Sequence, residues 1–424
     1  MKNRKQQPPV YIDARLPLIK PAATRLGNGL PVYFLEGGTE EIVKVEVVFF
    51  AGSYYQIKPL VAFATGNLLR YGTIRKTRAE INELFDYYSA HIQVEAQKDI
   101  VSVGMFVLGK HLPAAFDLFC EIINEPIFPE KEMNIFLSNK KQLHIINQKK
   151  VQHLARSYFN ELIYGEAHPY GYRLLNEDFD KVQREDLVSF HQDWFHAGNA
   201  FCIVSGRIPE TMATTVKRGL GAMKAPVTEE VKPPVYHMLS SGRRQIQLEM
   251  PGALQSAIRV GKQILNRAHP AYHRLKITNA LLGGYFGSRL MQNIRQDKGY
   301  TYGINSSLVS LLRSGYFFIA TQVGADVRKA ALDEIYKELE ALRSQPASDE
   351  ELEILKNYLA GNFLRSFDGP FAQAARYKEL LVFGMDWSHH EDFLTELKSI
   401  TAEEIMETAG LYLREEEMME VVVG

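Results

Sequence analysis

The feature that most constrains the fold is an internal duplication, in which short patterns recur about half a chain apart. The run Ala114-Ala115-Phe116-Asp117 opens a helical pattern and has a counterpart in Ala330-Ala331-Leu332-Asp333. Likewise, Glu177-Asp178-Phe179 precedes an acidic turn and is matched by Glu391-Asp392-Phe393. The matches are collinear, and their period is far longer than that of solenoid repeats. A chain of 424 residues with this pattern predicts two related domains.

A polar, proline-rich segment separates the two halves. It has three prolines between residues 223 and 242, together with several charges, and this composition is typical of an extended linker. We therefore predict a first domain at residues 1–222, a linker at 223–242 and a second domain at 243–424.

Each half mixes strands with long helices. Runs of β-branched and aromatic residues predict strands, and apolar residues at three- and four-residue spacing predict helices. The expected strands are Ile42–Phe50, Ile100–Leu108, Phe201–Val204, Gln245–Glu249 and Gly315–Gln322. The expected helices are Thr77–Tyr88, Leu112–Asn124, Lys131–Asn147 and Val327–Arg343. This order predicts an α+β fold rather than a doubly wound sheet.

Charge and composition exclude several classes of protein. A net charge of −1 argues against a nucleic-acid binder, and the lysines within 140–150 fit a solvated helix face. Cys120 and Cys202 lie in apolar surroundings, which predicts buried thiols rather than disulfides. No apolar stretch is long enough for a signal peptide or a membrane span. We therefore expect a cytoplasmic protein that binds neither nucleic acid nor membrane.

The common catalytic motifs are missing from the sequence. Neither H-x-x-E-H nor its inverse occurs among the twelve histidines, and there is no nucleophile elbow or P-loop. His269 and His273 are four residues apart, but Pro270 stands where a metallopeptidase needs its glutamate. We interpret this pair as a solvent-facing helix start.

One region nevertheless has the frame of a known motif. The strand Asn28-Gly29-Leu30-Pro31-Val32 and the turn Ala51-Gly52-Ser53 lead into Leu60–Thr73, which reads LVAFATGNLLRYGT. This resembles the insulinase/pitrilysin family of zinc peptidases, in the branch of the mitochondrial and bacterial processing peptidases. There the segment reads G-x-A-H-F-L-E-H-x-x-F-x-G-T. The resemblance implies two duplicated domains, each a mostly antiparallel sheet packed with helices.

The residues that carry the family's metal chemistry are absent. Phe63 and Asn67 stand where the two zinc histidines belong, and Gly66 stands where the general-base glutamate belongs. The third ligand of the family is a glutamate before H-P-x-G, but the segment KKQLHIINQKK before His168-Pro169-Tyr170-Gly171 has no acid. Catalytic zinc requires about three protein ligands and a water that a base deprotonates. We expect neither a metal nor hydrolysis in this chain alone.

A second segment resembles the signature of the family's second domain. Leu281–Leu290 and Ile294–Tyr302 are similar to L-G-G-x-x-S-R-L followed by I-R-x-x-x-G-x-x-Y. The resemblance implies that Arg295 and Tyr302 bind the carbonyl of the substrate backbone and stabilise the oxyanion. Arg289 is expected to pin its loop or to cap a helix. The resemblance also places at Ile92–Ala96 an edge strand that pairs with extended substrate, and an ordinary edge strand is the alternative.

Loss of the metal site together with a complete donor pair indicates a divided function. The resemblance implies the non-catalytic, substrate-binding subunit of a heterodimeric zinc metallopeptidase. Arg295 and Tyr302 would then act in trans, beside the zinc of a homologous partner that bears H-x-x-E-H, on a peptide or unfolded polypeptide. The alternative is a catalytically inert peptide-binding or structural scaffold of the same fold, which forms a homodimer.

Overall fold

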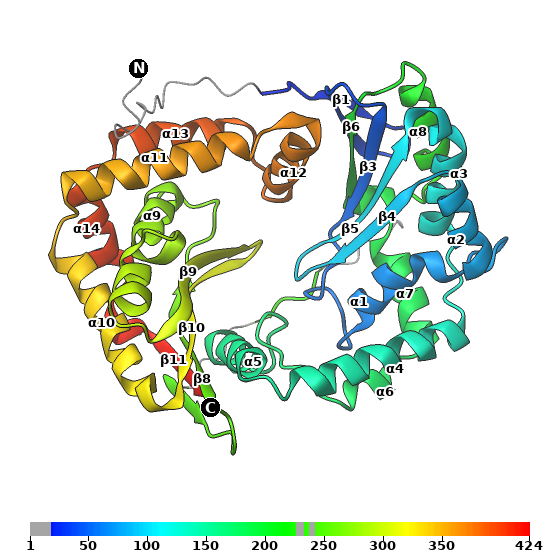
Figure 1. Ribbon diagram of the computed structural model, residues 1–424. Helices are drawn as coiled ribbons and strands as arrows, with labels where there is room; N and C mark the ends of the chain where they lie inside the picture. Colours follow the sequence, from blue (N-terminus) through cyan, green and yellow to red (C-terminus); the bar gives the residue numbers. More distant parts are fainter. Residues whose placement is uncertain (1–17, 226–232, 237–241) are drawn as a thin grey trace. The chain divides into compact units, whose positions relative to one another are not determined.

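The computed structural model describes residues 18–225, 233–236 and 242–424 (Figure 1). It divides into two compact units. The N-terminal unit contains Ile19–Arg243 and Gly369–Ala375, and the C-terminal unit is built mainly from Arg244–Asp368 and Arg376–Gly424. Most of the expected linker at 223–242 lies outside the described residues, so the domain limits stay a prediction. Within the described ranges, no helix has the length and apolar character needed to span a membrane.

The N-terminal unit is organised around a six-stranded sheet. Its order is β1-β2-β6-β3-β5-β4, and every neighbouring pair is antiparallel except β2 with β6. The central strand β6 is buried along its whole length, because β2 and β3 flank it. The strands are β1 (Ala22–Arg25), β2 (Pro31–Glu36), β3 (Ile42–Phe49), β4 (His91–Ala96), β5 (Val101–Leu108) and β6 (Ala200–Gly206).

Helices pack on this sheet through apolar faces. Helix α3 buries Phe116, Phe119 and Ile123 toward β5 and α8, while α1 packs on β4, β5 and α7 (Figure 1). The helices are α1 (Val61–Leu68), α2 (Arg78–Tyr87), α3 (Leu112–Asn124), α4 (Glu130–Asn147), α5 (Val151–Tyr164), α6 (Asp178–Lys181), α7 (Arg184–Trp194) and α8 (Met212–Leu220). Short 3₁₀ turns are η1 (Leu69–Tyr71), η2 (Gly109–His111) and η3 (Ala197–Asn199).

The C-terminal unit has a five-stranded sheet in the order β7-β11-β8-β10-β9. Helix α10 packs on β8 and β10, and α14 packs on α9 and α10 (Figure 1). The strands are β7 (Gln245–Leu248), β8 (Gln255–Ile264), β9 (Thr301–Leu311), β10 (Ser314–Gly324) and β11 (Met419–Val423). The helices are α9 (Tyr272–Asn279), α10 (Arg328–Ser344), α11 (Asp349–Arg365), α12 (Gly369–Val382), α13 (Ser388–Ser399) and α14 (Ala402–Tyr412), with π-helical η4 (Ala280–Gly284) and η5 (Met291–Asp297) and 3₁₀ turns η6 (Ala325–Val327) and η7 (Glu415–Glu417). The first half of α12, Gly369–Ala375, is the segment counted with the N-terminal unit.

The two sheets share one topology, which confirms the predicted α+β fold and its duplication. Strands β2-β6-β3-β5-β4 of the N-terminal unit correspond in order to β7-β11-β8-β10-β9 of the C-terminal unit. The last strand of the N-terminal unit, β6, lies parallel to β2 and antiparallel to β3. In the same way, the last strand of the C-terminal unit, β11, lies parallel to β7 and antiparallel to β8. The succession β5, η2, α3 is repeated as β10, η6, α10, at the position of the first sequence match.

The expected elements agree with the observed ones to within one or two residues at each end. Apolar periodicity was sufficient to locate these strands and helices because each of them buries one face or both. Cys120 and Cys202 are buried free thiols, as expected, and burial raises the pKa of both.

Candidate functional site

Two of the segments that frame the resemblance, the Ala51-Gly52-Ser53 turn and His168–Gly171, both contact Lys98 and Asp99 in the N-terminal unit. The backbone N–H of Gly52 donates to the carbonyl of Asp99 at 3.2 Å, and a Cβ at Gly52 would lie 2.4 Å from the Lys98 backbone. Lys98 Nζ donates to the carbonyl of Pro169 at 2.8 Å, and the hydroxyl of Tyr170 donates to Asp99. Burial lowers the pKa of Lys98 to about 8. These motifs are therefore explained by packing, independently of any metal.

Helix α1 carries the three positions that correspond to the metal motif. Gly66 is buried, and a Cβ there would lie 2.9 Å from Cγ1 of Val101 and 3.5 Å from Cγ1 of Val94. A glutamate at this position would need the sheet beneath it to move, because a β-branched valine has little rotamer freedom. Glycine here allows α1 to approach β4 and β5 closely.

Phe63 lies under a lysine from α4. Its ring centroid is 5.7 Å from that of Phe136, and Lys140 Nζ lies 5.4 Å from the Phe63 centroid and 5.3 Å from the Phe136 centroid. An ammonium group over two aromatic faces is a cation–π arrangement. A metal ion at this place would meet a positive charge and two rings that cannot ligate it.

The side chain of Asn67 forms a hydrogen bond within its own helix. Its Nδ2 donates to the carbonyl of Phe63 at 2.8 Å, one turn back along α1. Across the part of the chain that the structure describes, no group of three or more His, Cys, Asp or Glu side chains is arranged to bind a metal ion. The donor set at Phe63, Gly66 and Asn67 therefore does not fit zinc.

Sequence reasoning missed the role of α4 at this place. The lysine cluster was interpreted as a solvated helix face, but Lys140 is half-buried against α1. The spacing of Phe136 and Lys140, four residues apart, places them on one face of α4. That this face meets Phe63 depends on the packing of α4 against α1, which the local sequence does not encode.

Arg289 lies in the loop between η4 and η5 of the C-terminal unit and pins it, as expected. Its Nε and Nη2 donate to the two carboxylate oxygens of Glu351 at 2.7 and 2.8 Å. Glu351 belongs to the first turn of α11, so this bidentate pair ties the glycine-rich turn to that helix. The hydrogen bond to Glu351 raises the pKa of Arg289.

Arg295 and Tyr302 are placed differently. Arg295 lies on η5, half-buried, with its guanidinium carbon 4.8 Å from the centroid of the exposed Phe286 ring. Tyr302 is the second residue of β9 and is 93% exposed. Within the described residues, neither the guanidinium of Arg295 nor the hydroxyl of Tyr302 has a hydrogen-bond or ion-pair partner. Both groups are free to bind a ligand, although no contact joins one to the other.

The expected edge strand is also observed. Strand β4, which contains Ile92–Ala96, ends the six-stranded sheet and pairs only with β5. Its outer edge presents backbone donors and acceptors of the kind that can add a further strand.

Fold and site together resemble a metallopeptidase architecture in which α1, at the position of the metal motif, carries no metal-binding side chains. Comparison with known proteins agrees. Residues 181–359 match the family model described as the peptidase M16 inactive domain. The predicted resemblance is thereby confirmed: the chain is similar to zinc peptidases of the M16 type, and its sequence lacks H-x-x-E-H.

Relatives in sequence and structure cover nearly the whole chain. An uncharacterized zinc protease of Bacillus subtilis is 22% identical over 390 residues, which is 89% of this chain and 92% of the relative. The solved structure of a peptidase M16 inactive domain from Pseudomonas fluorescens has a TM-score of 0.85 at 22% identity and covers 95% of this chain and 98% of its own. A protease from Helicobacter pylori has a TM-score of 0.87 at 17% identity, with 96% and 99% covered.

Proposed function

We propose that this chain is the non-catalytic, substrate-binding subunit of a heterodimeric zinc metallopeptidase. Its partner is a homologous subunit that bears H-x-x-E-H and zinc. This chain contributes Arg295 and Tyr302 in trans to the partner's site, where they bind the carbonyl of a peptide or unfolded polypeptide. The charged guanidinium and the neutral hydroxyl then stabilise the oxyanion that develops when water attacks.

The observation that carries this proposal is the contrast between Arg289 and Arg295. Arg289 is committed to Glu351 through two hydrogen bonds, whereas Arg295 has only the ring of Phe286 beside it among the described side chains. An arginine without a carboxylate partner, held by an aromatic face, is suited to bind an external oxygen atom. Tyr302 is exposed on the same segment of chain and offers a second donor.

Edge strand β4 supplies a second element of the proposal. A peptide that adds to β4 would be recognised mainly through its backbone, which suits a subunit that accepts unfolded substrates of varied sequence. The side chains that line the lost metal site cannot themselves activate water, since they offer an aromatic ring, a glycine and an amide.

The test is kinetic analysis of the complex with its zinc-bearing partner. The tagged chain is purified from its native cells, the partner is identified by mass spectrometry, and peptide cleavage is measured for the complex. We expect Arg295→Ala to lower kcat/KM by about 10²- to 10³-fold, the usual effect of removing one oxyanion donor. Tyr302→Phe, which removes only the hydroxyl, should also lower kcat.

Lys298→Ala is the matched control, because it removes a positive charge from the same loop. Among the described side chains, the ammonium of Lys298 forms an ion pair only with Glu334, at 3.9 Å. Its complex should cleave at the wild-type rate. Cleavage by the complex that is unaffected by Arg295→Ala would contradict the proposal. Recovery of the chain alone, metal-free and inert, would favour the homodimeric scaffold.

A further inference from the structure

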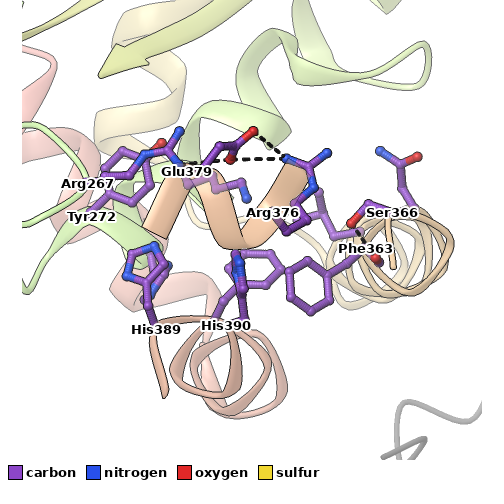
Figure 2. Close-up of a pocket in the computed structure, with 13 residues that line it drawn as sticks. Arg267, Tyr272, Phe363, Ser366, Arg376, Glu379, His389 and His390 are labelled. Atoms are coloured by element: carbon purple, nitrogen blue, oxygen red, sulfur yellow. Dashed lines mark hydrogen bonds and ion pairs between the residues drawn. The ribbon is translucent and has the colours of Figure 1, made fainter. Parts of the chain in front are cut away.

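A cavity of about 310 Å³ lies within the C-terminal unit, where helices α9, α11, α12 and α13 come together (Figure 2). It is separate from the oxyanion donors of the proposed function, since neither Arg295 nor Tyr302 lines it. Its walls combine charged side chains, three histidines and aromatic rings. One of these histidines is His273, so the expectation of a solvent-facing pair holds for His269 and is wrong for His273.

Positive charge exceeds negative charge in this cavity. Glu379 accepts from Arg267 Nη1 at 2.9 Å and from Arg376 Nη1 at 3.1 Å, as the dashed lines in Figure 2 show. Although burial opposes ionisation, the two arginines lower the pKa of Glu379. Lys276 also lines the cavity, with Nζ 4.4 Å from the Phe393 centroid and no carboxylate partner among the described residues. Three cations thus share one carboxylate.

Lys276 stays mainly protonated at neutral pH. Burial lowers its pKa to about 8, with Arg267 and Arg376 as further causes, and only Glu379 acts in the opposite direction. With Lys276 charged, the four ionised side chains of the wall carry a net charge of about +2. Excess charge of one sign in a half-enclosed site is costly unless a counter-charge binds there.

Several polar atoms of the wall also have no hydrogen-bond partner. In the described part of the chain these buried atoms include Arg267 Nε, His273 Nδ1 and His390 Nε2. An arginine Nε–H is always a donor, and either histidine nitrogen becomes a donor in the appropriate tautomer or on protonation. Burial lowers the pKa of His273 and His390 to about 3, so both are neutral at pH 7 unless an anion binds beside them.

We propose that this cavity binds a small molecule that bears a phosphate group. The phosphate lies against Lys276, Arg376 and the histidines of α13, and the apolar part of the molecule contacts Phe363 and Phe393. A phosphate monoester carries a charge of about −1.5 to −2 near pH 7, which balances the excess on the wall. Its oxygens accept hydrogen bonds from the donors that lack partners.

Other occupants fit less well. A divalent cation would meet three positive side chains and neutral histidines that have no acidic partner except Glu379, which is already paired with two arginines. A carboxylate would balance only half of the excess charge. Water would satisfy the free donors but none of the charge.

The test is isothermal titration of the full chain, in a buffer free of phosphate, with inorganic phosphate, phenyl phosphate and phenylacetate. We expect phenyl phosphate to bind at least about tenfold more tightly than phenylacetate, because it carries the second negative charge and more acceptor oxygens. Equal affinity for inorganic and phenyl phosphate would support the site and identify free phosphate as the ligand. Tighter binding of phenyl phosphate would identify an organic phosphate.

Variants locate the binding. Lys276→Met should abolish phosphate binding and at the same time raise the thermal stability of the ligand-free protein, because it replaces a half-buried charge with an apolar side chain of similar size. These opposite effects separate lost binding from lost folding. Lys329→Met, at an exposed position of α10, is the matched control and should change neither. Absence of binding by wild-type protein at millimolar phosphate, or binding that Lys276→Met leaves unchanged, would overturn the proposal.

Discussion

At the scale of single residues, Gly66 explains why the metal motif cannot be restored by changing its residues alone. A Cβ at this position would lie 2.9 Å from Val101, which is fully buried at the start of β5. The close packing of α1 on β5 therefore disfavours a glutamate at position 66. Lys140 of α4 also disfavours a metal ion here, since it places a positive charge over Phe63.

Gly66→Ala should lower the free energy of unfolding by about 1–2 kcal/mol, because overpacking against Val101 exceeds the gain in helix propensity. Urea denaturation followed by circular dichroism measures the change. Gly361→Ala is the control, since Gly361 is exposed in α11 and a Cβ there meets nothing within 4 Å. It should raise the stability by about 0.5–1 kcal/mol. If Gly66→Ala instead raised the stability, Val101 and β5 would have to move to accommodate the added methyl group.

Phe286 is a positioning residue for Arg295 under the proposed function. An exposed cation–π contact contributes about 0.5–1 kcal/mol, so Phe286→Ala should lower kcat/KM of the complex about two- to fivefold. Phe286→Tyr keeps the aromatic face and should retain wild-type activity. Equal losses in both variants would mean that Phe286 contacts substrate or partner directly rather than through Arg295.

At the scale of elements, helix starts and strand edges decide what each segment can do. Strand β4 ends its sheet and α1 packs against it, so substrate addition at β4 would occur beside the positions that correspond to the metal motif.

Helix α14 illustrates how the local sequence determines where an element begins. Thr401 and Glu404 form a reciprocal capping box, with Glu404 N donating to Thr401 Oγ1 at 3.2 Å and Thr401 N to Glu404 Oε2 at 3.0 Å.

Thr401→Ala should lower the stability of the C-terminal unit by about 1 kcal/mol, because the backbone N–H of Glu404 loses its side-chain acceptor. The measurement is thermal unfolding by calorimetry. Thr395 is exposed on α13, and among the described residues its hydroxyl donates to the carbonyl of Glu391 in the same helix. Thr395→Ala should therefore change stability by less than about 0.5 kcal/mol. Equal changes in stability for the two substitutions would mean that the capping hydrogen bond does not stabilise α14.

At the scale of the whole molecule, buried histidines make stability depend on pH. Burial lowers the pKa of His191 and His389 to about 4 and that of His273 and His390 to about 3. His191 also meets the carbonyl of Ile123 at 2.8 Å. In the unfolded chain each histidine titrates near 6.5. As pH falls below that value, the unfolded state binds protons first, so stability is full above pH 6.5 and declines toward pH 4.

The urea concentration at the midpoint of unfolding should therefore decrease as the pH is lowered from about 7 to about 5 in a buffer free of phosphate. His191→Gln should make this decline shallower, since it removes one group that the fold keeps neutral. His269→Gln, at an exposed position, is the control and should leave the slope unchanged. A midpoint independent of pH in wild-type protein would contradict burial of these side chains in the neutral form.

The sequence by itself determined the elements and the class of protein. Apolar periodicity located the five strands and four helices that the sequence analysis names, because the periodicity of each segment records which face is buried. The match between Ala114 and Ala330 located the duplication. The side chains at Phe63, Gly66 and Asn67 led to the expectation that this chain binds no zinc, from their chemistry alone. The pinning role of Arg289 followed from its place after the glycine-rich turn, although its partner Glu351 did not.

Only the tertiary structure decided which distant side chains meet. Lys140 over Phe63 joins α4 to α1, and the cationic cavity joins Arg267, Lys276 and Arg376 with histidines from α13. The local sequence around each of these residues does not show which other elements contact it, and His273 was interpreted as solvent-facing for that reason. Charge in such sites depends on burial and on neighbours supplied by other elements, so it arises from packing and cannot be deduced from local sequence.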